Sequence, residues 1–146
     1  MDDLDGLASA RLAAQGQRFT DSRRALLRLL ADAGQPLTLP DILDRRRDLA
    51  QSSVYRNLAV LEHCGLVQRI VTNDEWARYE LAEDLSEHHH HLICSGCGTV
   101  RDVAVSASLE QEIHRALTAA AAAAGFVAQY HRLDLVGLCA VCAAPA

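Results

Sequence analysis

Two C-x-x-C pairs constrain this chain more than any other feature. Cys94 and Cys97 form the first pair, and Cys139 and Cys142 form the second, near the C-terminus. Two thiolates at this spacing reach one ion, so the two pairs are the donor set of a tetrahedral four-cysteine zinc site. The alternatives are a pair of disulfides and a thioredoxin-like redox motif. We favour structural zinc, because the sequence carries no secretory segment and no other sign of an oxidising compartment.

A run of four histidines, residues 88–91, leads through an apolar dipeptide into the first pair. An expression tag would sit at a terminus, whereas this run is internal and continues into a sequence typical of a strand. Successive side chains of a strand face opposite sides, so His88 and His90 are predicted to share one face. The other two histidines, His89 and His91, would occupy the opposite face and serve a separate metal site. A loose polar loop that binds metal without a fold is the alternative.

The bulk properties set the class of protein. The 146 residues, half of them hydrophobic, are enough for one ordinary domain or two small ones. The apolar runs are shorter than a membrane span, and the acidic first residues lack the basic-then-apolar layout of a signal peptide. We therefore expect a soluble, cytoplasmic protein with no membrane partner. The remaining cysteine, Cys64, is expected to be a small buried hydrophobe.

The charge distribution separates two halves of the chain. The formal net charge of −5 argues against a generally basic nucleic-acid binder. Residues 1–65 contain nine Arg and nine Asp or Glu, whereas residues 66–146 contain five Arg and ten Asp or Glu. The excess acidity thus lies with the Cys and His residues, where carboxylate ligands are needed. All 14 basic residues are Arg, whose forked guanidinium suits phosphates and guanine edges.

Apolar residues at helical spacing predict four short helices in the first half of the chain. The second and third are expected to be capped by Thr20 and Thr38, because a side-chain oxygen there satisfies a free amide of the first turn. The fourth is expected to be capped by Ser52 or Ser53 and to end at Gly65.

A β-hairpin is predicted after the helices. Two apolar-rich runs, Leu66–Val71 and Trp76–Leu81, flank the polar residues 72–75. Short helices followed by a hairpin make a winged helix-turn-helix, in which the last helix enters the major groove. We assign residues 1–81 to this DNA-binding domain. The candidate DNA-contacting residues are Ser52, Ser53, Tyr55 and Arg56 at the start of the last helix, with Arg18 and Arg23 as phosphate contacts. An ordinary solvated helix face is the alternative interpretation.

The second half is predicted to be a small α/β domain. Residues 82–87 are polar and acidic and are expected to form a hinge, followed by a metal-binding dimerisation domain over residues 88–146. We expect a strand at Thr99–Val105, a helix opened by a Ser108–Gln111 capping box, and a strand at Phe126–Leu138. Such a unit is too small to bury both faces of its sheet, so we expect a homodimer formed through the sheet edge. The predicted fold class is α+β.

The order of these motifs resembles the ferric uptake regulator family of bacterial metal sensors over nearly the whole chain. The motifs that carry the resemblance are Gly16-x-Arg18-x-Thr20-x-x-Arg23, Ser53-Val54-Tyr55-Arg56-Asn57-Leu58, Arg78-Tyr79-Glu80-Leu81, and the His run with Ile93-Cys94-x-x-Cys97-Gly98 and His131. The resemblance implies a homodimeric repressor of metal homeostasis genes that binds a double-stranded DNA operator when its regulatory metal is bound. It implies no enzyme activity and no organic small-molecule substrate. It does not distinguish iron, zinc, manganese, nickel or peroxide sensing.

The resemblance also implies three metal sites. The structural Zn²⁺ is assigned to the four cysteines Cys94, Cys97, Cys139 and Cys142. The regulatory site, for a second divalent metal such as Zn²⁺ or Fe²⁺, is assigned to Glu80, His89, His91 and Asp102. An additional site is assigned to His88, His90, Glu110 and His131.

One departure from the family pattern concerns the regulatory metal. Many members supply a histidine from the DNA-binding domain just before the third helix, and Gln35-Pro36 stands there in this chain. The competing function classes are a small zinc-dependent hydrolase, a thiol redox protein and a zinc-ribbon protein-interaction module. The hydrolase is disfavoured because the sequence has neither H-E-x-x-H nor a Gly-rich phosphate loop. The interaction module has no need of Arg18, Tyr55 and Arg56.

Overall fold

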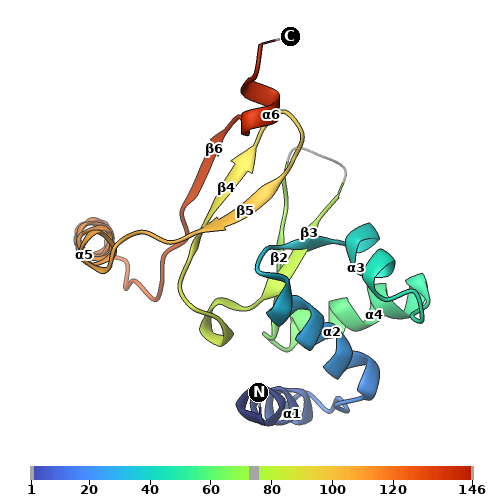
Figure 1. Ribbon diagram of the computed structural model, residues 1–146. Helices are drawn as coiled ribbons and strands as arrows, with labels where there is room; N and C mark the ends of the chain where they lie inside the picture. The colour runs from blue at the N-terminus through green and yellow to red at the C-terminus, as the bar shows by residue number, and fades with distance from the viewer. Residues whose placement is uncertain (1, 73–75, 146) are drawn as a thin grey trace. The chain divides into compact units, whose positions relative to one another are not determined.

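The chain divides into two compact units, Met1–His88 and His89–Ala146, which we call the N-terminal and C-terminal units (Figure 1). The computed structural model describes residues 2–72 and 76–145. Within these residues, every helix is too short or too polar to cross a lipid bilayer.

The N-terminal unit is a winged helix. Its three strands form an antiparallel sheet in the order β1-β3-β2, and the β2–β3 pair is the predicted hairpin. Of the predicted turn between these strands, residues 73–75 lie outside the described residues. The elements in chain order are α1 (Asp2–Ala14), α2 (Asp21–Ala33), β1 (Leu37–Thr38), α3 (Leu39–Arg45), α4 (Gln51–His63), β2 (Val67–Ile70), β3 (Arg78–Leu81) and the 3-10 turn η1 (Glu83–Leu85).

Side-chain caps fix the starts of two helices. Thr20 accepts a hydrogen bond from the amide of Arg23 and caps α2, as predicted. Thr38 and Asp41 form a reciprocal capping box at α3. The predicted serine cap of α4 is wrong. The Val54 amide already bonds the Ala50 carbonyl, so the helical ladder begins at Ala50 and both serines lie inside the first turn.

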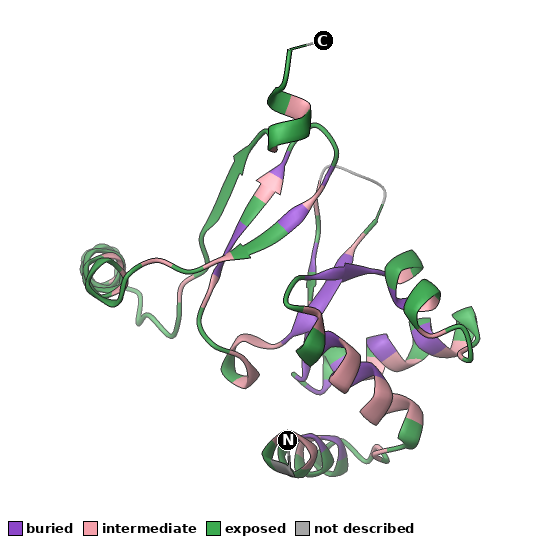
Figure 2. Cartoon of the chain, viewed as in Figure 1, coloured by how far each residue is buried: buried purple, intermediate pink, exposed green. Residues whose placement is uncertain are grey.

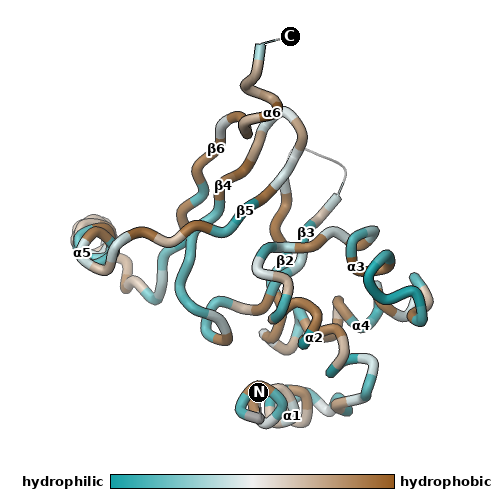
Figure 3. Tube along the Cα trace, viewed as in Figure 1, coloured by the Kyte–Doolittle hydropathy of each residue, from teal (hydrophilic) through white to brown (hydrophobic). Residues whose placement is uncertain are grey.

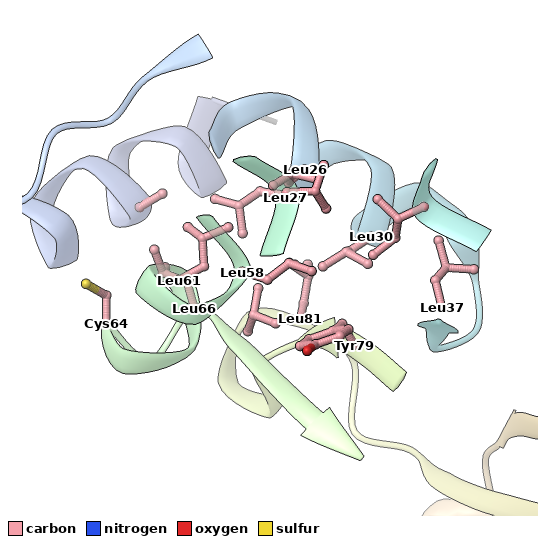
Figure 4. Close-up of a cluster of buried hydrophobic side chains, with 14 of the residues drawn as sticks. Leu26, Leu27, Leu30, Leu37, Leu58, Leu61, Cys64, Leu66, Tyr79 and Leu81 are labelled. Atoms are coloured by element: carbon pink, nitrogen blue, oxygen red, sulfur yellow. The ribbon is translucent and has the colours of Figure 1, made fainter. Parts of the chain in front are cut away.

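A single apolar core holds the N-terminal unit together (Figure 4). Leucines from α2 and α4 meet the inner face of the sheet, and Leu26, Leu58 and Leu61 are fully buried. Cys64 is 8% exposed and belongs to the same cluster, so its predicted role as a small buried hydrophobe is confirmed. Each fully buried leucine stabilises the fold by about 1.5–3 kcal/mol relative to an exposed one. This unit therefore owes its stability to ordinary hydrophobic burial.

The C-terminal unit is a small α/β sheet. The strand order is β5-β4-β6, with β4–β5 antiparallel and β4–β6 parallel. The central strand β4 carries the end of the histidine run, and its register pairs His91 with Asp102 on one side and Asp134 on the other. The elements are β4 (His90–Cys94), β5 (Val100–Val103), α5 (Ala107–Ala123), β6 (Asp134–Gly137) and α6 (Ala140–Ala143).

Two predictions for this unit are wrong in detail. Ser106, not Ser108, caps α5, because its side chain accepts from the Leu109 amide. The predicted strand Phe126–Leu138 shrinks to β6, Asp134–Gly137. A strand needs a ladder partner, and β4 has only five residues, which pair with β6 from His91 onward. The residues before Asp134 run past the start of β4 and stay irregular.

The C-terminal unit has little apolar core of its own. Its buried hydrophobic side chains, among the residues described, are Cys94 and Val100. By contrast, Val127 is 92% exposed and Leu135 is 68% exposed. The β6 region is exposed in Figure 2 and largely hydrophobic in Figure 3. Exposed apolar surface of this kind is typical of interaction sites.

Candidate metal centres and nucleic-acid interface

We call each C-x-x-C pair with its short turn a knuckle. The four cysteines of the two knuckles converge on one point at the end of the C-terminal sheet. Their sulfur atoms all lie within 4.8 Å of one another, and the Cys97 and Cys139 sulfurs are 3.8 Å apart. Thiolates at about 2.3 Å from a tetrahedral zinc are separated by about 3.8 Å, whereas a disulfide requires about 2.05 Å. All five cysteines of the chain are free thiols. The geometry therefore fits a four-thiolate metal site and excludes the predicted alternative of two disulfides.

The local backbone is shaped for this cluster. A Cβ on Gly96 would lie 2.9 Å from the Cys142 sulfur, so only glycine allows the first knuckle to approach the second this closely. The Ser95 amide donates to the Gly137 carbonyl at 2.8 Å, and the Ser95 hydroxyl donates to the same oxygen at 3.1 Å. These two bonds join the first C-x-x-C pair to the end of β6, two residues before Cys139.

The cluster stabilises negative charge unevenly. The backbone amide of Cys139 donates a hydrogen bond to the Cys94 sulfur at 3.3 Å. This bond, together with those from the Cys97 and Gly96 amides, lowers the pKa of Cys94 to about 6. The Thr99 hydroxyl, 3.0 Å from the Cys97 sulfur, lowers the pKa of Cys97. The neighbouring sulfurs, Cys139 first, raise the pKa of Cys142 to about 12. Four thiolates therefore coexist here only beside a cation, which is the environment that a zinc ion provides.

A second cluster lies at the start of β4. His89 and His91 each direct Nε2 toward the same carboxylate oxygen of Asp102, at 3.7 Å in both cases. The two imidazole rings are nearly perpendicular, with centroids 5.1 Å apart. Their donor atoms and the Asp102 oxygen lie within 4.8 Å of one another. Two imidazoles and a carboxylate with converging lone pairs are a donor set for a divalent transition metal.

His90, which lies between these two histidines in the sequence, faces a different carboxylate. His90 places Nε2 at 2.8 Å from Glu110 on α5, and His131 places Nε2 at 2.5 Å from the other oxygen of the same carboxylate. The His90 ring is buried and stacks on the His131 ring at 5.5 Å. The structure thus brings together these three residues, which are far apart in the sequence, around one point separate from Asp102.

The remaining two predicted ligands belong to the N-terminal unit. Glu80 lies on β3, is 5% exposed, and accepts a hydrogen bond from Gln68 at 2.5 Å. His88 contacts Glu83 of the turn η1 through its Nδ1 atom. Their participation in the two histidine clusters stays a prediction. Gln35-Pro36 precedes β1, and a proline at this place offers no donor side chain.

Asp134 also contacts this cluster, although the sequence did not predict it. Its carboxylate oxygen lies 3.2 Å from Nδ1 of His91. The contact follows from the parallel register of β4 and β6, which sets Asp134 directly beside His91. An Asp at the beginning of a predicted strand gives no local signal of such a contact, because the pairing joins residues 43 positions apart.

The predicted DNA-contacting residues gather around the first turns of α4. Ser52, Tyr55 and Arg56 are exposed, and Tyr55 keeps 59% of its surface open. The opposite face of the helix packs into the core through Val54 and Leu58. Such an exposed start of a helix, with polar and guanidinium groups, suits base edges in the major groove.

The two predicted phosphate contacts have different surroundings. Arg18 is exposed. Arg23 is half-buried and donates from Nε to the Asn57 side chain at 3.0 Å and from Nη1 to the Arg18 carbonyl at 2.7 Å. Asn57 in turn donates to the Ser53 hydroxyl at 3.4 Å. Arg23 therefore ties the loop that carries Arg18 to α4, and its predicted contact with a phosphate stays a prediction.

Comparison with known proteins gives a consistent result. Residues 14–136 match the model of the ferric uptake regulator family. The peroxide operon regulator of Bacillus subtilis (strain 168) is 30% identical over 135 residues, which are 90% of this chain and 88% of that protein. The Vibrio cholerae ferric uptake regulator has a TM-score of 0.68 at 25% identity, covering 90% of this chain and 98% of that one. The Helicobacter pylori ferric uptake regulator has a TM-score of 0.74 at 22% identity, covering 99% and 94% respectively, and shares the fold.

Proposed function

This chain belongs to the ferric uptake regulator family, whose members are metal-responsive transcription regulators and not enzymes, and we propose that it is a metal-dependent DNA-binding repressor of metal homeostasis genes. The observation that carries the proposal is the sorting of alternate histidines to different carboxylates. His89 and His91 meet Asp102, whereas His90 meets Glu110. One strand thereby serves two separate donor sets beside a four-cysteine cluster.

The structural site in this proposal is the cysteine quartet with Zn²⁺. Bound zinc would supply the positive charge that four neighbouring thiolates require, and a structural zinc contributes about 10 kcal/mol or more to folding of a small domain. The four residues are Cys94, Cys97, Cys139 and Cys142.

The regulatory site in this proposal adds Glu80 to His89, His91 and Asp102. Glu80 lies near the end of the wing strand β3, whereas the other three residues belong to the C-terminal unit. Glu80 is thus the only one of the four proposed ligands through which bound metal would act directly on the DNA-binding N-terminal unit. The bound metal favours the DNA-competent arrangement only by its difference in affinity for the two states. Nitrogen and oxygen donors suit Fe²⁺ and Zn²⁺, and we assign one of these as the regulatory metal.

The additional site in this proposal adds His88 to His90, Glu110 and His131. The support is the close meeting of both imidazoles with one Glu110 carboxylate inside the C-terminal unit. Because neither of these histidines contributes to the Asp102 cluster, the additional site is expected to tune metal affinity or dimer stability without carrying the main metal response.

The DNA contacts in this proposal come from α4 and the segment before α2. Tyr55 and Arg56, with Ser52 and Ser53, would meet base edges, and Arg18 and Arg23 would meet phosphates. The support is the exposure of Tyr55, Arg56 and Arg18.

The repressor is proposed to act in the cytoplasm as a homodimer on an operator in double-stranded DNA. Regulators of this family are dimeric DNA-binding proteins. In this chain the support is the exposed apolar surface of the C-terminal unit, for example Val127 and Leu135. Two copies that cover this surface would present two winged helices to successive turns of DNA.

The experiment that tests the function is a gel mobility shift on the DNA upstream of the protein's own gene. The zinc-loaded protein is titrated with Fe²⁺ under anaerobic conditions, or with Zn²⁺, and then with a chelator too weak to remove thiolate-bound zinc. The proposal expects a retarded band that forms with added metal and disappears with the chelator. Binding that is absent at all metal concentrations, or equal at all of them, would refute the proposal.

A further inference from the structure

Asp134 is a carboxylate beside a metal-ligand histidine and outside all three proposed ligand sets. It opens β6, the strand that runs parallel to β4, and the register pairs it with His91. Its Oδ1 atom lies 3.2 Å from His91 Nδ1. The Asp134 side chain is 37% exposed, whereas the His91 side chain is only 6% exposed.

The two nitrogens of the His91 ring face two different carboxylates. Nδ1 faces Asp134 at 3.2 Å, and Nε2 faces Asp102 at 3.7 Å. A neutral imidazole carries one N–H group and one lone pair. A carboxylate at 3.2 Å from Nδ1 accepts a hydrogen bond from that N–H. The lone pair then lies on Nε2, on the side where His89 and Asp102 offer their own donor atoms.

We infer that Asp134 is a positioning residue for the regulatory metal, and this inference rests on the regulatory site proposed above. Asp134 holds His91 in the Nδ1–H tautomer and fixes the direction of Nε2 before the ion arrives. Metal-ligating histidines commonly donate their other N–H to a carboxylate, and loss of that partner weakens metal binding by about 10- to 100-fold. Asp134 is not itself a metal ligand in this arrangement, because its partner atom is the ring nitrogen that faces away from Asp102.

The same strand anchors Asp134 to the four-cysteine cluster. Three residues after Asp134, the Gly137 carbonyl accepts both hydrogen bonds from Ser95, and Cys139 follows two residues later. The knuckles therefore hold one end of β6, and the other end carries the carboxylate that orients His91. The single short strand β6 in this way connects the proposed structural site to the proposed regulatory site.

The test uses the full-length, zinc-loaded protein in two forms, free of regulatory metal and titrated with Mn²⁺. Asp134→Leu removes the acceptor at similar side-chain size, and Asp134→Glu keeps a carboxylate. Glu112→Gln serves as the matched control, because Glu112 is an exposed carboxylate on α5 outside the three clusters.

The first readout is the tautomer of His91 before metal addition, measured by long-range ¹H–¹⁵N NMR of the imidazole nitrogens. The wild-type protein and Glu112→Gln are expected to show a proton on Nδ1 of His91. In Asp134→Leu that signature is expected to be lost, and in Asp134→Glu it is expected to return in part. An unchanged His91 tautomer in Asp134→Leu would overturn the inference.

The second readout is the Mn²⁺ affinity of each cluster, assigned by paramagnetic broadening of the His89 and His91 resonances against those of His90 and His131. Asp134→Leu is expected to weaken Mn²⁺ binding at the first pair by about 10- to 100-fold and to leave the second pair unchanged. An unchanged affinity at the first pair, or an equal loss at both pairs, would overturn the inference. Neither readout involves DNA, so failure of the repressor function would appear separately, in the mobility shift.

Discussion

The two units of this chain are stabilised in different ways. The N-terminal unit buries a continuous cluster of leucines between α2, α4 and its sheet. The C-terminal unit buries two histidines, His90 and His91, but among hydrophobic side chains only Cys94 and Val100 within the residues described. The first unit is therefore expected to fold through its own core, whereas the second is expected to depend on bound metal and on a second copy of the chain. The proposed metal sites thus lie mainly in the unit that has the smaller apolar core.

Loss of a cysteine ligand in the C-terminal unit is expected to have a larger effect than any other substitution considered. Cys97→Ser removes one thiolate, and the zinc contribution at stake, about 10 kcal/mol or more, is comparable with the net stability of a whole domain, about 5–15 kcal/mol. We expect the C-terminal unit to unfold or the dimer to dissociate, while the N-terminal helices persist. Zinc analysis, size-exclusion chromatography and circular dichroism measure this. A variant that keeps its zinc, dimer and full helicity would show that the quartet is not the structural site.

A cavity in the apolar core of the N-terminal unit is expected to have a smaller and more local effect. Leu58→Ala opens a cavity in the core of the N-terminal unit and is expected to cost about 2–5 kcal/mol of that unit's unfolding free energy. Zinc content should not change. The matched control is Leu135→Ala on exposed β6, where the cost to the monomer is expected to stay within about 0.5 kcal/mol and the dimer is expected to weaken. Denaturant unfolding and sedimentation measure the two effects. A large loss of monomer stability in Leu135→Ala would contradict the division of roles.

The smallest free-energy change is expected at the DNA surface. Arg56→Ala is expected to cost about 1–3 kcal/mol on the preferred operator and to relax its sequence preference. Arg18→Ala is expected to weaken binding to all sequences alike and to reduce the salt dependence of log K by about one unit. Fluorescence anisotropy at several salt concentrations separates the two effects. Operator binding like that of the wild type in both variants would mean that the DNA-contacting surface lies elsewhere on the chain.

Local signals predicted much of the fold. Thr20 and Thr38 predicted the helix starts that they cap, and the apolar runs after α4 predicted the hairpin. The spacing of the cysteines predicted that four sulfurs from two distant segments meet. The first two successes share a cause, since capping and strand alternation depend on residues a few positions apart. The meeting of the two distant cysteine pairs was predicted for another reason, because a tetrahedral zinc site needs four ligands.

Most of what the sequence did not predict depends on contacts between distant residues. Asp134 beside His91 depends on the parallel pairing of two strands, and the bounds of β6 depend on the length of its partner β4. The predicted contact of Arg23 with a phosphate stays a prediction, but nothing in the sequence indicated its hydrogen bonds to Asn57 and to the Arg18 carbonyl, which arise only when α2 and α4 pack. The predicted cap of α4 was wrong because the N-cap of the helix is Ala50, before both of the serines that could have capped it.

If the structural and regulatory metal sites are separable, His89→Ala disables the regulatory site and leaves the structural site intact. Operator binding is measured by anisotropy during an Fe²⁺ or Zn²⁺ titration of the wild type, His89→Ala and His90→Ala. We expect His89→Ala to stay folded and dimeric, to keep one zinc per chain in its four-cysteine site, and to show no metal-induced DNA binding. His90→Ala is expected to keep a weakened metal response. An equal and complete loss of response in both variants would contradict the claim, because it would mean that the histidines form a single cluster.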